Sequence, residues 1–106
     1  MDYKVLGQVA PLAATETDLY VVPSGRSAVS SSLVVTNRGG APGTYRLSVS
    51  IGGVPTANES YLFYDVSVPK NTAVAIVLGI TAAETDVVRV YASTANFSFN
   101  LFGGEQ

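Results

Sequence analysis

The chain has 106 residues, of which 47% are hydrophobic and only 13% charged, and its formal net charge at pH 7 is -2. It contains no cysteine and no histidine, which excludes disulfide bonds, Ser-His-Asp and Cys-His nucleophile systems, and metal sites built on these side chains. Its six Lys and Arg residues are too few for the basic surface that binds nucleic acids, so we expect no nucleic-acid partner.

Hydrophobic and polar residues alternate along the first half of the chain, a period of two that is typical of strands with one buried face. Proline and glycine mark turns at residues 23–25 and 38–43. Residues 10–17 include Pro11 and show no helical period, so we expect a loop there. The sequence therefore predicts four strands in this half, at about residues 3–9, 17–22, 27–37 and 44–51.

The second half continues the pattern, with turns at residues 52–55 and 69–71. Its four predicted strands lie at about residues 60–68, 72–79, 86–93 and 96–102. No segment between them has the period of a crossover helix, which favours antiparallel pairing. We therefore expect an all-β chain with one domain, residues 1–106, folded as an antiparallel β-sandwich of jelly-roll-like form with about eight short strands. Residues 1–10 are expected to form an edge strand or an N-terminal arm.

Several predicted strands carry apolar residues on both faces, although a two-layer sandwich buries only one face of each sheet. The charged fraction is also about half of the ~25% that is usual for a soluble domain. Both observations indicate that the outer faces are covered by other copies of the chain or by a partner. The candidate interface residues are Tyr3, Val5, Val34, Val77, Val87 and Phe102.

A second candidate surface comes from the six tyrosines, since aromatic rings with polar tips are common at interfaces and sugar-binding sites. Packing in the core or between subunits is the commoner role of such residues in strands. One group nevertheless combines rings with short polar side chains, as polysaccharide binding requires. The candidate glycan contacts are Asn58, Tyr61, Tyr64 and Asp65.

Carboxylates are the remaining side chains in the sequence that could bind a metal ion or act in catalysis. Glu16 and Asp18 precede one predicted strand, and Glu84 and Asp86 precede another. Such residues commonly cap turns through backbone N–H groups, and we favour that role over a calcium site. A short-looped β-domain of this length also leaves little room for a catalytic cleft, so we expect no enzymatic activity and no cofactor.

Residues 1–8 lack the basic and apolar regions of a secretory signal. The longest apolar run, residues 73–80, is far shorter than the ~20 residues that span a bilayer. We therefore expect a protein that is made in a cytoplasm and has no membrane partner.

Five strand-and-turn segments resemble short virion proteins of tailed bacteriophages: residues 3–8, 19–25, 34–38, 86–93 and 97–103. The resemblance covers most of the chain and contains no catalytic or binding motif. It implies a small all-β structural protein that decorates or cements the capsid, or belongs to the neck, baseplate or tail fibres.

From these observations we expect a non-enzymatic virion protein, assembled in the host cytoplasm, that acts as a capsid decoration or cement protein through surface burial. Its expected partners are other copies in a homo-oligomer, a trimer being one arrangement, and the major capsid protein or tail proteins. The alternative is a module of the tail, baseplate or fibre that binds host-surface polysaccharide.

Overall fold

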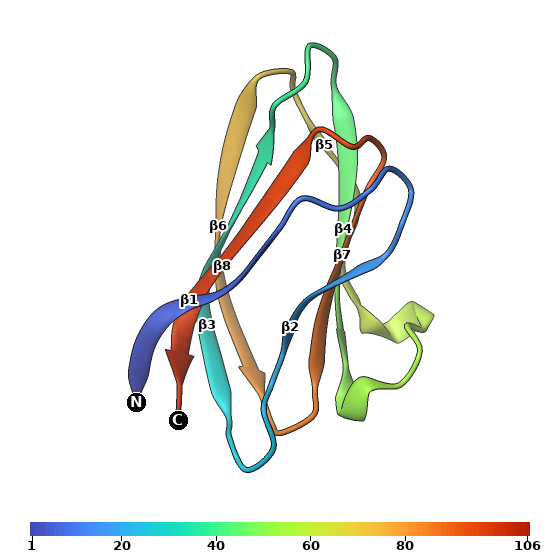
Figure 1. The fold of residues 1–106 in the computed structure, drawn as a ribbon. Helices are drawn as coiled ribbons and strands as arrows, with labels where there is room; N and C mark the ends of the chain where they lie inside the picture. The colour runs from blue at the N-terminus through green and yellow to red at the C-terminus, as the bar shows by residue number, and fades with distance from the viewer.

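The computed structural model describes residues 1–106 and contains eight strands in two four-stranded antiparallel sheets that pack face to face (Figure 1). This confirms the prediction of an all-β sandwich. Two short 3-10 turns, η1 (Ile51–Gly53) and η2 (Asn58–Ser60), lie between the fourth and fifth strands. The strands are β1 (Asp2–Val9), β2 (Thr17–Val21), β3 (Ala28–Asn37), β4 (Gly43–Ser50), β5 (Tyr61–Val68), β6 (Thr72–Ala82), β7 (Val87–Ala92) and β8 (Phe97–Glu105).

The strand order is that of a jelly roll. One sheet, here sheet A, has the order β1-β8-β3-β6, and the other, sheet B, has the order β2-β7-β4-β5. The first half of the chain pairs with the second as a long antiparallel ribbon, β1 with β8, β2 with β7, β3 with β6 and β4 with β5. Winding this ribbon into two layers produces the double Greek key of jelly rolls, with both termini at one end of the molecule (Figure 1).

The core lies between the inner faces of the two sheets, where alternate residues of each strand are buried. The Tyr45 ring lies 6.1 Å from the rings of both Phe63 and Phe99, measured between centroids. The largest fully buried side chains are Tyr45, Phe97, Phe99, Leu33, Leu47 and Leu101. These are the inward positions of the period-two pattern, which explains why that pattern identified the strands.

Two strands extend beyond their predicted ends. β6 continues past Gly79 to Ala82, and β8 continues through two glycines to Glu105. Both extensions pair with the start of β3, where Ala28 lies opposite Ala82 on one side and Glu105 on the other. Ladder pairing with a central strand therefore overrides the weak strand preference of glycine. No helix of the structure has the length and apolar character needed to cross a membrane.

One side of the sandwich is less closed than the rest. The inward-facing residues of β6, such as Ile76, Leu78 and Ile80, are only half-buried. Leu78 and Ile80 lie near Phe63 of β5, which is an edge strand of the other sheet. A hollow of about 430 Å³ lies between β5 and β6. The apolar interior is therefore accessible along the β5–β6 side.

Candidate interaction surfaces

The outer face of sheet A gathers five of the six predicted interface residues. The pairing register sets Val5, Phe102, Ser32 and Val77 in one row across all four strands. The next row contains Tyr3 and Val29, on either side of Gly104. Tyr3 is 84% exposed and Val77 is 91% exposed, so the apolar groups of these rows face the solvent.

This face carries no charge. Beyond the two rows above, the register places Gln8, Asn100, Val34 and Ala75 in a third row. Ser98, Thr36 and Ala73 form a fourth row. A surface that is apolar or neutral across four strands loses little hydration free energy when it is covered, which is the property of an interface core.

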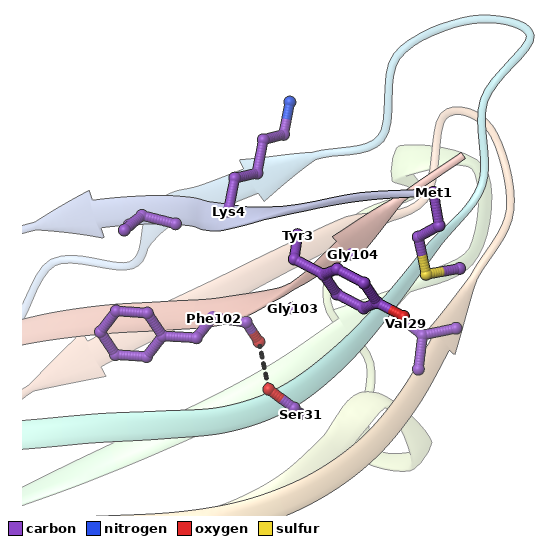
Figure 2. Close-up of a pocket in the computed structure, with 9 residues that line it drawn as sticks. Met1, Tyr3, Lys4, Val29, Ser31, Phe102, Gly103 and Gly104 are labelled. Atoms are coloured by element: carbon purple, nitrogen blue, oxygen red, sulfur yellow. Dashed lines mark hydrogen bonds between the residues drawn. The ribbon is translucent and has the colours of Figure 1, made fainter.

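A hollow of about 490 Å³ indents this face at the β1 end, where Met1, Tyr3 and Val29 surround Gly104 (Figure 2). A Cβ atom on Gly104 would lie 2.4 Å from the Met1 sulfur, so the glycine provides the space in which these side chains lie. Beside it, Ser31 donates a hydrogen bond of 3.3 Å to the Phe102 carbonyl. The hollow is thus a mainly apolar recess, whose one charged lining residue, Lys4, pairs with Glu105.

Val5 is 46% exposed, and Val34 and Phe102 are partly buried on the same face. Val87 differs, because it is buried, with an exposed fraction of 5%. The expectation that it forms exposed surface was wrong. Val87 points outward from β7 in sheet B, but the η1 segment covers it. Gly53 of η1 lies beside the Val87 side chain.

Arg89 holds that covering segment in place. Its guanidinium donates hydrogen bonds of 3.1 Å to the Gly53 carbonyl and 2.8 Å to the Val54 carbonyl. It also donates to Asp18, at 3.0 Å, which pairs it with β2. Further bonds reach the hydroxyls of Ser50 and Thr56. The β4–β5 connection is therefore pinned to sheet B and forms part of the folded body.

The predicted glycan cluster lies on the outer face of sheet B, opposite the uncharged face. Tyr61 and Tyr64 contact each other edge to face, with 4.9 Å between ring centroids. Arg46 lies between Tyr64 and Tyr91, 4.1 and 4.3 Å from the two ring centroids. Asn58 is exposed in η2 and makes no hydrogen bond to this group.

A β-bulge makes the cluster possible. Asp65 has a φ of 51°, and the β4–β5 register shifts at this point, so Tyr64 and Asp65 both reach Arg46. Arg46 donates two hydrogen bonds to the Asp65 carboxylate, at 2.7 and 3.3 Å. This hydrogen bonding raises the pKa of Arg46 above its ordinary value. Sequence analysis missed Arg46 and Tyr91, since their contacts depend on strand pairing.

Two of the four acidic residues at the strand entrances, Glu84 and Asp86, act as caps, as the sequence analysis favoured, whereas Asp18 pairs with Arg89 and Glu16 accepts a hydrogen bond from the Thr56 hydroxyl. Asp86 accepts hydrogen bonds from the backbone N–H groups of Gly52 and Ala83, both at 2.9 Å. Glu84 accepts one from the N–H of Gly25, at 2.6 Å. No group of three or more potential ligands among Asp and Glu residues lies close enough to hold a metal ion.

One buried carboxylate was not predicted at all. Glu105 is 4% exposed and accepts hydrogen bonds from the Tyr20 hydroxyl, at 2.5 Å, and from Lys4 Nζ, at 3.0 Å. Arg26 lies 3.8 Å away. The Tyr20 and Lys4 hydrogen bonds hold the pKa of Glu105 below its ordinary value. Burial, followed by the bond to Glu105, raises the pKa of Tyr20.

Comparison with protein-family models and with curated proteins finds no match to this chain.

Proposed function

We propose that this protein is a non-enzymatic structural subunit of a tailed-phage particle, which decorates or cements the capsid through the outer face of sheet A. The observation that carries the proposal is the absence of charge across the four rows of that face, with Tyr3 and Val77 almost fully exposed. The resemblance of its strand-and-turn segments to phage virion proteins indicates that the assembly is a phage particle. Jelly rolls are also a recurrent architecture of viral capsid proteins.

The proposed mechanism is burial of surface. Each 1,000 Å² of apolar area removed from water contributes about 25 kcal/mol before the entropy of association is subtracted. The uncharged face brings no ion that must lose its hydration, so the cost of burying it is limited to its neutral polar groups, such as Gln8 and Asn100. Repetition over a capsid lattice would add avidity to each contact.

The test uses particles assembled without this chain and the purified protein added back. We expect the wild-type protein to sediment with the particles and Tyr3→Glu to remain in the supernatant, because the substitution places a charge on the otherwise uncharged face. Tyr3 is 84% exposed, so the fold tolerates the change. Leu12→Glu is the matched control, since Leu12 is 73% exposed but lies in the β1–β2 loop. Equal sedimentation of the two variants would overturn the proposal.

A second candidate function, polysaccharide binding by a tail or fibre module, is favoured by the ring pair of half-buried Tyr61 and exposed Tyr64 on the outer face of sheet B. Against it, one face of Tyr64 and both oxygens of Asp65 already contact Arg46. Host-polysaccharide binding by the isolated protein that is lost in Tyr64→Ala and kept in Tyr3→Glu would select this function over the first.

A further inference from the structure

The sandwich has four edge strands, and three of them carry features that block pairing with another strand. β1 bears Asp2 and Lys4 and has a register shift before Gly7. β2 has only five residues and includes Asp18. β5 is bent by the bulge at Asp65. Charges, short length and bulges are the devices by which edge strands avoid association.

β6 lacks two of these devices, since it is neither short nor charged, and its irregularity is a register shift against β3 between Val77 and Ile80. It is the longest strand, with 11 residues, and contains neither a charged residue nor a proline. Exposed and half-buried positions alternate from Thr72 to Thr81, so the side chains of β6 keep the period of a strand across this register shift. A long, uncharged edge strand presents free backbone N–H and C=O groups to another strand.

We propose that β6 pairs with the β6 strand of a second copy, antiparallel and centred on Val77. Val77 is the middle residue of the strand, and it is 91% exposed. Pairing about this residue sets Val77 against its own copy on the outer face, where Ala75 meets Gly79. On the inner face, Ile76 meets Leu78. Every opposed pair is uncharged, as cross-strand pairing favours.

The charges that flank the strand match the same register. Lys70 precedes Val77 by seven residues and Glu84 follows it by seven. In the antiparallel dimer, the turn that carries Lys70 and the turn that carries Glu84 of the second copy, each just beyond an end of β6, therefore come together at both ends of the paired strands. A parallel arrangement would instead bring like charges together, so charge complementarity favours the antiparallel form.

The paired strands would form one eight-stranded sheet and extend the uncharged outer face across both copies. The half-buried inner residues of β6, including Leu78 and Ile80, would gain neighbours beside the hollow at the β5–β6 side. This pairing does not depend on the proposed function. If the protein forms the β6-paired dimer but does not bind particles, the pairing is confirmed and the proposed capsid contact is refuted.

Cysteine cross-linking tests the register directly, because the chain contains no cysteine. We expect Val77→Cys to form a disulfide-linked dimer under mild oxidation, since directly opposed Cβ atoms lie about 5 Å apart. Ala73→Cys lies on the same face of the same strand, yet its copy would be about 26 Å away at 3.3 Å per residue, so it should stay uncross-linked. The double variant Ala73→Cys/Thr81→Cys should cross-link again.

Sedimentation of the unmodified protein provides the second measurement. We expect a dimer for the wild type and for Val5→Lys, and a monomer for Val77→Lys, which would place two lysines together at the symmetry centre. Lys70→Glu should weaken dimerisation, and the addition of Glu84→Lys should restore it. A monomeric wild type, a dimer that tolerates Val77→Lys, or equal cross-linking of Val77→Cys and Ala73→Cys would overturn the proposal.

Discussion

At the scale of single residues, the most constrained group is the buried carboxylate of Glu105. A buried charge is tolerated only where partners replace its lost hydration. Here the Tyr20 hydroxyl and the Lys4 ammonium do so, and they connect sheet B, β1 and β8 at the end where the chain termini meet. These contacts hold the C-terminal end of β8 in place, although Glu105 follows two glycines.

The lowered pKa of Glu105 predicts an acid-dependent contribution to stability. A carboxylate whose pKa is lower in the folded state stabilises the fold above its unfolded pKa, near 4.5, and loses that contribution as the pH falls through the folded value. Glu105→Gln should therefore lower the urea midpoint at pH 7, and its difference from wild type should shrink below pH 4.5.

Urea denaturation at a series of pH values measures this effect. Glu59→Gln is the control, because Glu59 is exposed and makes no ion pair within 4 Å. Its midpoint should follow that of the wild type throughout. A constant difference between Glu105→Gln and wild type from pH 7 down to pH 2 would show that the ionisation of Glu105 does not stabilise the fold.

At the scale of elements, β1 depends on a close approach to the other sheet. Gly7 lies at the register shift of β1, and a Cβ atom there would be 2.1 Å from the Leu19 carbonyl oxygen of β2. Because the obstacle is backbone, it cannot rotate away. We expect Gly7→Ala to destabilise the protein by about 3 kcal/mol, the upper end for overpacking, and to loosen β1.

Hydrogen exchange of the β1 amides, combined with urea denaturation, measures this prediction. Gly40→Ala is the matched control, since no atom lies within 4 Å of its Cβ position. It should leave both stability and exchange close to those of the wild type. Equal stability of the two variants would mean that β1 can shift without cost to the fold.

The elements also show what sequence analysis could reach. Alternation identified all eight strands, because inward residues such as Leu33, Leu47 and Phe99 are apolar at every second position. It predicted the turn at residues 52–55 but not that residues 51–60 cover sheet B, where Arg89 binds them from a strand more than thirty residues away. Long-range hydrogen bonds leave no local pattern, so the burial of Val87 could not be foreseen.

At the scale of the whole molecule, the low content of charged residues and the strand order together explain why one face of the sandwich is uncharged. With 13% charged residues, the chain cannot cover two sheets with charge, and the structure concentrates the deficit on the outer face of sheet A. The outer face of sheet B keeps the ion pairs of Arg46 and Arg89. Sequence alone indicated apolar outer positions, but strand order was needed to show that five of them share one face.

This uneven distribution of charge predicts how particle binding responds to salt. Raising NaCl from about 0.1 M to 1 M shortens the Debye length from about 10 Å to 3 Å and screens contacts between charged surfaces. The outer face of sheet A contributes no charge, so the fraction of protein bound to particles should stay constant. Sulfate, which strengthens apolar burial, should increase it. Release of the protein by NaCl in the sedimentation assay would instead assign the contact to the charged face of sheet B.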